Sequence, residues 1–200
     1  MSKRAENVFG SKDIFFGILV PYFEKNKNRL CTVFLGSACE QWINGECFYA
    51  LVNSNNSFWV RPEKSKANLV LFKSPKEEEQ NKASLVIETK ILYSDEYPSD
   101  QKLKLDILRN QLIKASKRFS TDNVVGLLVF FKWEYRVVGE TTWVPSRKTN
   151  KPFMSFFDIE KTGLKDKFAH EGRRHLGKEV INLRKYEYWV DAAMEVVCVK

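Results

Sequence analysis

Short apolar runs separated by polar clusters recur through the middle of the chain. They are rich in aliphatic, β-branched and aromatic residues, and each is short enough to form one strand. The last run is almost wholly apolar, which is typical of a central strand covered on both faces. The predicted strands span residues 57–61, 66–72, 83–93 and 124–133.

Apolar residues at helical spacing predict two helices around these strands. In residues 101–119, leucine and alanine recur at steps of three and four positions. Residues 30–53 form the other predicted helix, with a break near Gly36, and residues 13–23 are either a helix or a packed extended segment. The order is then helix, three strands, helix and strand, which predicts an α/β fold with a crossover between strands of one sheet.

The pattern weakens after Trp133. Residues 134–144 predict a strand with a turn at Gly139, and residues 146–151 (SRKTNK) predict a basic loop. Residues 161–177 are rich in basic residues and predict no element. Three later segments could be strands that complete the sheet, at residues 153–159, 180–183 and 188–199, the last two alternatively a short helix. No repeat or linker interrupts the chain, so we expect one domain over residues 1–200, with a core at 36–133 and a C-terminal elaboration at 134–200.

Composition narrows the class of protein. Hydrophobic residues make up 44% of the 200 residues and charged residues 29%, as in ordinary soluble globular proteins. No apolar run approaches the roughly 20 residues of a membrane span, and the N-terminus does not resemble a signal peptide. We therefore expect an intracellular protein that does not enter a membrane.

The cysteines have no zinc-type spacing with one another or with the two histidines, and we expect reduced, mostly buried thiols at Cys31, Cys39, Cys47 and Cys198.

The formal net charge of +8 favours a polyanionic partner, of which nucleic acid is the commonest. Basic side chains of the C-terminal third are candidates to hold phosphates, although a solvated basic surface would have the same composition. A basic α/β interaction protein unrelated to nucleic acid is therefore an alternative. The candidate phosphate contacts are Arg147, Lys148, Lys151, Arg173 and Arg174.

An acid and an amine interrupt the strand predicted at residues 83–93. Side chains alternate across a strand, so Glu88 and Lys90 are expected on one face and Thr89 on the other. Charged residues are rarely buried without a partner, which favours a functional role, while an ordinary cross-strand salt bridge is the alternative.

Two acids of the first predicted helix are candidates to join this pair. Glu40 shares a helical stripe with the apolar residues Ile43 and Cys47, so it faces the interior or a cleft, or else it only caps the helix as part of an S-x-x-E capping box. Glu46 lies on another face of the helix and is either a second candidate or a solvated acid.

The succession of a helix with an inward acid, a hairpin, an E-x-K strand, an amphipathic helix and an apolar strand resembles the PD-(D/E)xK nuclease superfamily. The resemblance covers roughly residues 36–133 and implies a restriction-endonuclease-like fold, with a mixed β-sheet flanked by helices. Glu88 and Lys90 match the E-x-K element of this family, and Glu40 matches the acid that many members carry on the preceding helix.

The resemblance implies a metal-dependent endonuclease that hydrolyses phosphodiester bonds of double-stranded DNA with Mg²⁺ or Mn²⁺. Glu88, Glu40 and the backbone carbonyl of Thr89 would then be metal ligands, and Lys90 would orient or deprotonate the attacking water. A homodimer would suit symmetric cleavage of both strands.

One position departs from the family. Its other acid stands at the start of the second hairpin strand, where this chain has Asn68. An amide offers a neutral oxygen, whereas Mg²⁺ favours carboxylates, so the substitution should remove much of the metal affinity. Glu63 or Glu46 would complete the site, or the chain is a non-catalytic nucleic-acid-binding or assembly protein on a nuclease fold, or it is an inactivated version of an active nuclease.

Overall fold

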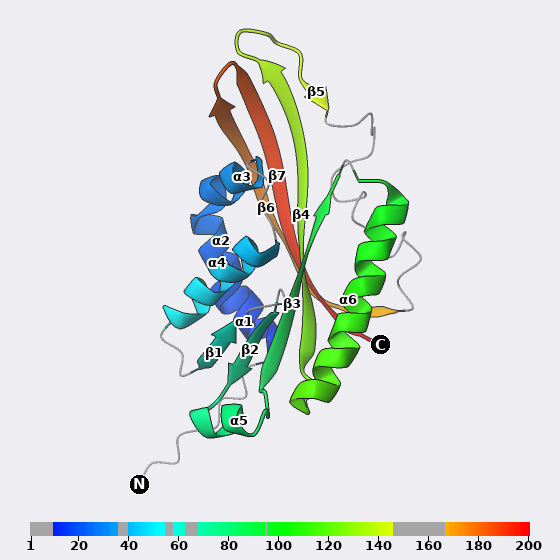
Figure 1. Cartoon of the computed structure of the whole chain (residues 1–200). Coiled ribbons are helices and arrows are strands. Elements are labelled where there is room, and N and C mark those ends of the chain that lie inside the picture. The colour runs from blue at the N-terminus through cyan, green and yellow to red at the C-terminus, as the bar shows by residue number, and fades with distance from the viewer. Residues whose placement is uncertain (1–9, 36–39, 55–57, 63–67, 95, 146–166) are drawn as a thin grey trace.

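The computed structural model describes residues 10–35, 40–54, 58–62, 68–94, 96–145 and 167–200. These residues form a mixed α/β fold built on one seven-stranded sheet (Figure 1). The strand order is β1-β2-β3-β4-β7-β6, and the short β5 (Val144–Pro145) pairs with β4 off this path. The other strands are β1 (Trp59–Pro62), β2 (Asn68–Phe72), β3 (Leu85–Tyr93), β4 (Val124–Val137), β6 (Phe168–Leu183) and β7 (Tyr186–Val199).

The central part of the fold follows the predicted order of elements. Helix α4 (Glu40–Val52) precedes β1, β2 and β3, which pair antiparallel with one another in sequence. Helix α6 (Pro98–Phe119) then crosses over, and β4 pairs parallel with β3. The crossover onto the same sheet is confirmed, and β4 is the central strand that its apolar sequence predicted.

Helices cover the sheet on both faces, as Figure 1 shows. On one face lie α4 and the N-terminal helices, and on the other lies α6. Alternate residues of β3 divide between the two cores: Ile87 and Ile91 pack on the α4 side, Val86 and Leu92 on the α6 side. The N-terminal helices are α1 (Ser11–Ile14), a π-helical turn (Phe15–Leu19), α2 (Val20–Lys25) and α3 (Lys27–Leu35).

Buried thiols belong to the α4-side core. Cys31 and Cys47 are free and buried, and burial raises the pKa of Cys31 to about 12 and that of Cys47 further still. Cys198 is also free and is partly exposed. Cys39 lies outside the described residues.

The largest difference from the predicted elements is the C-terminal hairpin. β6 and β7 pair antiparallel over 16 and 14 residues, and β6 runs through a basic segment for which the sequence predicted no element. Register shifts after His170 and His175 interrupt the alternation of β6, which removes the period-two signal. Residues 180–183 lie in β6 and residues 188–199 in β7, so both segments are strands and neither is a short helix.

Smaller differences occur elsewhere. The connector at residues 73–82 contains a short helix, α5 (Pro75–Glu79), whose first turn is capped by the Ser74 hydroxyl accepting from the Glu77 amide at 3.3 Å. β4 continues to Val137 instead of ending at Trp133, so it includes the first part of the strand predicted at 134–144. The turn predicted at Gly139 is present, with a positive φ of 92° at this glycine, and Val144–Pro145 form β5 after it. The basic loop predicted at 146–151 and the strand predicted at 153–159 lie outside the described residues. Among the helices that are described, none combines the length and the apolar character needed to cross a bilayer.

Candidate functional site

The E-x-K element lies in the middle of β3 and is buried. Glu88, Thr89 and Lys90 are 2%, 0% and 8% exposed. Lys90 is paired in register with Leu128 of β4, which packs in the core beneath α6. Glu88 and Lys90 therefore leave the strand on the α6 face and Thr89 on the α4 face, as the alternation predicted.

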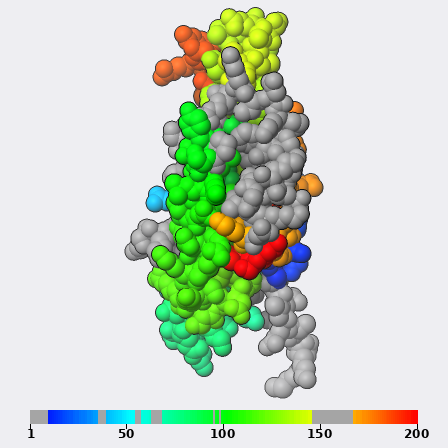
Figure 2. Space-filling model, turned by 90° about the vertical axis from the view of Figure 1, so that its right-hand side faces the viewer, coloured from blue at the N-terminus to red at the C-terminus, as the bar shows by residue number. Residues whose placement is uncertain are grey.

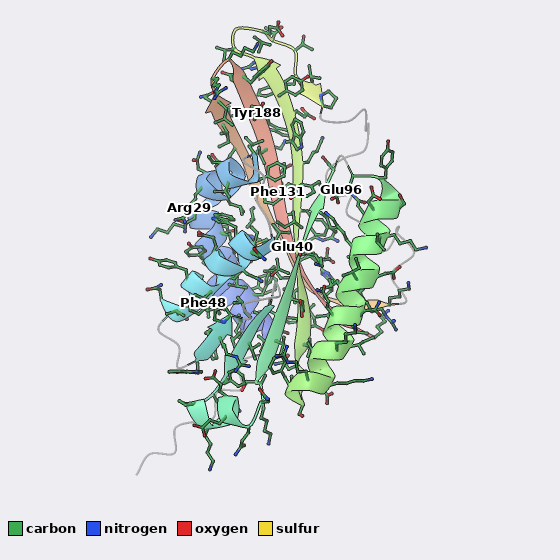
Figure 3. The ribbon with its side chains drawn as sticks, viewed as in Figure 1. Arg29, Glu40, Phe48, Glu96, Phe131 and Tyr188 are labelled. Carbon is green, nitrogen blue, oxygen red and sulfur yellow. The ribbon has the colours of Figure 1, made fainter. Side chains whose placement is uncertain are left out.

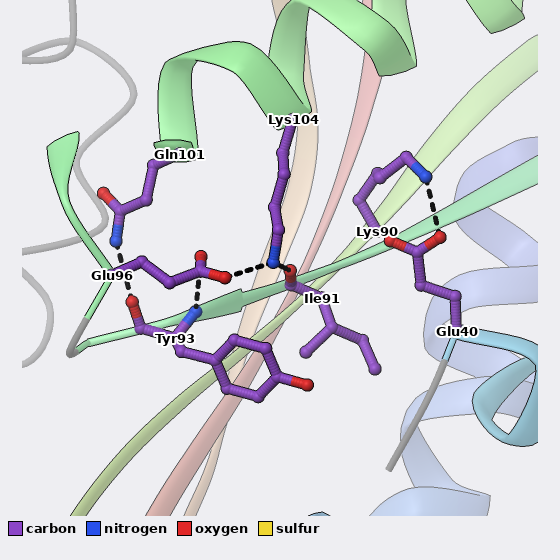
Figure 4. Close-up of polar contacts among 7 residues, drawn as sticks. All are labelled: Glu40, Lys90, Ile91, Tyr93, Glu96, Gln101 and Lys104. Atoms are coloured by element: carbon purple, nitrogen blue, oxygen red, sulfur yellow. Dashed lines mark hydrogen bonds and ion pairs between the residues drawn. The ribbon is translucent and has the colours of Figure 1, made fainter. Parts of the chain in front are cut away.

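Lys90 nevertheless reaches the helix on the opposite face. Its Nζ lies 2.7 Å from Oε2 of Glu40, the first residue of α4 (Figure 4). The Lys90 side chain is 10% exposed and that of Glu40 is 28% exposed, so the pair is at the boundary between core and solvent. To make this contact the lysine must pass the edge of β3, close to where the described part of β2 begins. Glu40 thus contacts the lysine of the E-x-K element from the border of the interior. Ser37, the first residue of the predicted capping box, lies outside the described residues.

A second contact joins α4 to β3 one turn further along the helix. The Thr89 hydroxyl donates to Oδ1 of Asn44 at 2.6 Å, and both side chains are buried. Glu40 and Asn44 are four residues apart on one face of α4, so one helix face fixes two consecutive residues of β3. Asn44 was not predicted from the sequence, although a polar residue beside Ile43 on an apolar stripe is a signal that could have identified it.

Side chains from α6 and the preceding loop bind the backbone at the end of β3, as Figure 4 shows. Lys104 Nζ donates to the Ile91 carbonyl at 3.0 Å and also binds Glu96, while Gln101 Nε2 donates to the Tyr93 carbonyl at 2.8 Å. The backbone groups of Ile91 and Tyr93 thus point to one edge of the strand. Because residues two apart in a strand point to the same edge, the Thr89 carbonyl faces it as well.

Asn68 begins β2, which agrees with its predicted position at the start of the second hairpin strand. The antiparallel register pairs Asn68 directly with Glu88. The position where the family has its other acid therefore lies across from the glutamate of the E-x-K element. Glu63, the alternative acid of the hairpin, lies outside the described residues.

Glu46 is engaged elsewhere. Its carboxylate accepts from the Tyr22 hydroxyl at 2.5 Å and from Arg29 Nη2 at 2.6 Å. Burial, followed by the hydrogen bond to Glu46, raises the pKa of Tyr22 to about 12. Glu46 is therefore buried rather than solvated, and it ties α4 to α2 and α3 instead of joining the contact between Glu40 and Lys90.

Two of the five predicted phosphate contacts lie among the described residues, and both are paired within the chain. Arg173 binds Glu195 of β7 through Nε at 3.0 Å and Nη2 at 2.7 Å, and Glu195 is only 1% exposed. Arg174 Nε lies 2.7 Å from Oε1 of Glu24. Both contacts link β6 to its surroundings, and Arg147, Lys148 and Lys151 fall in the range 146–166, outside the described residues.

The chemistry available to the site follows from these positions. Glu40, Glu88 and the Thr89 carbonyl are oxygen donors of the type that Mg²⁺ and Mn²⁺ prefer. Across the described part of the chain, however, no group of three or more His, Cys, Asp and Glu side chains is arranged to hold a metal ion. Comparisons with protein-family models, with curated proteins and with solved structures found no match to this chain.

Proposed function

We propose that this chain is a nuclease-type domain with a restriction-endonuclease-like fold, whose site around Glu40, Glu88 and Lys90 acts on the phosphodiester backbone of DNA. Support comes from the succession of α4, β1, β2, β3, α6 and β4, with antiparallel pairing through β3 and parallel pairing of β3 with β4. The E-x-K element lies in the third of these strands, and its lysine contacts the acid of the preceding helix.

The contact between Lys90 and Glu40 is the observation that carries the proposal. Its two residues are 50 positions apart in the chain, one in the central strand β3 and the other at the start of helix α4. Burying an ion pair costs desolvation energy that the attraction often fails to recover, so such a pair is a poor way to gain stability alone. The ion pair is explained if the site needs a lysine beside carboxylates for its chemistry.

In this proposal each side chain has a separate task. Lys90 would hold the attacking water or take its proton, and its positive charge would offset the charge that develops on the phosphate. Asn44 would act as a positioning residue, because its bond to Thr89 fixes the strand that carries the other groups. A divalent ion, held by Glu40, Glu88 and the Thr89 carbonyl, would supply further charge stabilisation and a more acidic water.

The ligand atoms are oxygens of the type that such an ion prefers, but together they carry little negative charge. Glu40 and Glu88 are carboxylates, whereas Asn68 contributes no charge where the resemblance implies an acid. Glu40 must also share its carboxylate with Lys90. We therefore expect weak binding of Mg²⁺ or Mn²⁺ and low activity in this chain, and stronger binding with higher activity when residue 68 is aspartate.

The presence of Asn68 instead of an acid favours a second candidate, a protein that binds nucleic acid without cutting it or serves in assembly. Replacing a metal-binding acid by its amide keeps the shape of a site while removing its chemistry. The net charge of +8 would still attract DNA. Unlike the first candidate, such a protein would leave bound DNA uncleaved when a divalent ion is present.

Cleavage of plasmid DNA and of single-stranded DNA, each in Mg²⁺ or Mn²⁺, separates the two candidates. The chain and its Asn68→Asp variant are assayed side by side, each with a Lys90→Ala control. Cleavage that appears or rises with Asn68→Asp and is lost with Lys90→Ala is the expected result. Salt-sensitive DNA binding by both proteins without cleavage by either would favour the binding protein, and the absence of both binding and cleavage would refute the proposal.

A further inference from the structure

The ends of β4, β6 and β7 extend beyond the helices that cover the rest of the sheet (Figure 1). In Figure 2 the yellow-green turn after β4 and the orange-red turn between β6 and β7 stand out at one end of the molecule. We call the side chains of Trp133, Tyr135, Tyr186 and Tyr188 in this region the aromatic tip. Neighbouring ring centroids of the aromatic tip lie 5.9–6.3 Å apart.

All four rings lie on the α4-side face of the sheet. Tyr135 is paired in register with Tyr188, and directly opposed residues of an antiparallel pair share a face. Trp133 and Tyr188 pack at the border of the α4-side core, and Figure 3 shows Tyr188 beyond the end of the helical layer. The rings are half-buried by one another, and the adjoining Val137 and Leu183 are exposed. An uncovered sheet face is normally polar, so this surface has a composition suited to a partner.

Cations accompany aromatic rings in the same region. Lys185 Nζ lies 5.3 Å from the ring of Tyr186, and Lys178 Nζ lies 4.3 Å from the ring of Trp189 on the other face. Neither lysine has a carboxylate partner among the described residues. Arg136, by contrast, binds Glu187. Aromatic rings beside amines are the combination that proteins use to stack unpaired bases while attracting phosphates.

The aromatic tip and the candidate site are linked by β4, and they meet on the α4 side of the sheet only through Lys90, because Glu88 leaves β3 on the α6 side. The Phe34 ring of α3 stacks on Phe131 between them, so the distance along β4 is the shortest separation.

Lys90 is in register with Leu128 of β4, and Trp133 and Tyr135 follow further along the same strand. At about 3.3 Å per residue, the separation is roughly 16–23 Å. A stacked strand rises about 3.4 Å per nucleotide, so the gap corresponds to about five to seven nucleotides. This length is within the range of single-strand binding sites.

We propose that the aromatic tip binds unpaired nucleotides, and that the substrate of the proposed nuclease is therefore single-stranded or branched DNA rather than plain duplex. The statement about the nuclease substrate rests on the proposed function, whereas the statement that the aromatic tip binds unpaired nucleotides does not. A duplex keeps its base faces stacked inside the helix, so it cannot present them to Trp133, Tyr135, Tyr186 or Tyr188. An unpaired strand can, because every base has a face to stack and stacking needs no particular sequence.

The test is binding of fluorescently labelled (dT)₂₀, (rU)₂₀ and a 20-base-pair duplex, measured by anisotropy in EDTA at fixed salt. The full chain is compared with a Tyr135→Ala, Tyr186→Ala variant and with a Tyr135→Phe, Tyr186→Phe variant, which keeps the rings. We expect (dT)₂₀ to bind more tightly than duplex, the alanine variant to lose about fivefold or more in affinity, and the phenylalanine variant to bind like the parent. Matching circular dichroism spectra and unfolding curves establish that each variant is folded.

Several outcomes would overturn the inference. These are equal affinity of the alanine and phenylalanine variants for (dT)₂₀, duplex binding as tight as that of (dT)₂₀, and a homodimer that the alanine variant dissociates, which would make the tip a contact between copies. Tighter binding of (rU)₂₀ than of (dT)₂₀ would overturn the assignment to DNA. EDTA removes metal-dependent cleavage from the assay, so a failed stacking result and a failed nuclease result remain distinguishable.

Discussion

The ion pair between Lys90 and Glu40 should respond unequally to the loss of either partner. In Glu40→Gln, the Lys90 ammonium stays in a site where its side chain is 10% exposed, with its carboxylate partner replaced by a neutral amide. In Lys90→Met, the Glu40 carboxylate loses its partner but, at 28% exposed, it can turn toward water. Methionine also preserves much of the length and apolar character of the lysine stem.

The difference in burial sets the magnitudes. Breaking a fully buried pair by removing one partner costs about 3–5 kcal/mol, and an exposed pair is worth about 0–1 kcal/mol. For a pair at the boundary we expect Glu40→Gln to lower the free energy of unfolding by about 2–3 kcal/mol and Lys90→Met by about 1 kcal/mol or less. Urea unfolding of both single variants and the double variant measures the two effects and their coupling. Equal losses, or a larger loss for Lys90→Met, would refute the reasoning from burial.

Three further predictions concern the surroundings of the site. Asn44→Ala leaves the Thr89 hydroxyl buried without its acceptor and should cost about 1–3 kcal/mol in urea unfolding, part of which Thr89→Val in the same variant should restore. Gly126→Ala would bring a Cβ within 2.8 Å of Leu108 Cδ2, so we expect a loss of about 1–3 kcal/mol in the same assay, and no loss would show that α6 moves away freely. Tyr22 has a folded-state pKa of about 12, above its ordinary value of 10.0, so its contribution to stability is complete below pH 10 and declines as the pH rises toward 12. Between pH 10 and pH 12 the free energy of unfolding of the parent should therefore fall by more than that of Tyr22→Phe. Equal falls in the two proteins would contradict the assignment of the raised pKa to Tyr22.

The middle of the fold could be predicted because its local signals agree with its tertiary environment. The apolar run of β4 is covered on both faces, and the leucine repeat of α6 packs on one of them. The C-terminal hairpin gave weaker signals. β6 lies at the edge of the sheet, carries charged residues such as Arg173 along much of its length, and loses its alternation at two register shifts.

Within the candidate site, the residues that could be predicted from the sequence are those whose charge conflicts with their apolar neighbours. Glu88, Lys90 and Glu40 stood out for this reason, and the contact between Lys90 and Glu40 joins two of them. Asn44 was missed because a neutral amide conflicts less with its surroundings, and its role depends on Thr89, which is distant in the chain. The engagement of Glu46 with Tyr22 and Arg29 could not be predicted, because it depends on how three helices pack.

Binding of Mn²⁺ by isothermal titration calorimetry tests the central claim, that positions 68 and 88 belong to one metal-binding nuclease site, most directly. The proteins compared are the chain, Asn68→Asp, and Asn68→Asp combined with Glu88→Gln. We predict that Asn68→Asp raises the affinity by about tenfold or more and that Glu88→Gln abolishes the gain, since both carboxylates would bind one ion. No gain with aspartate at position 68, or a gain that persists without the Glu88 carboxylate, would contradict the account.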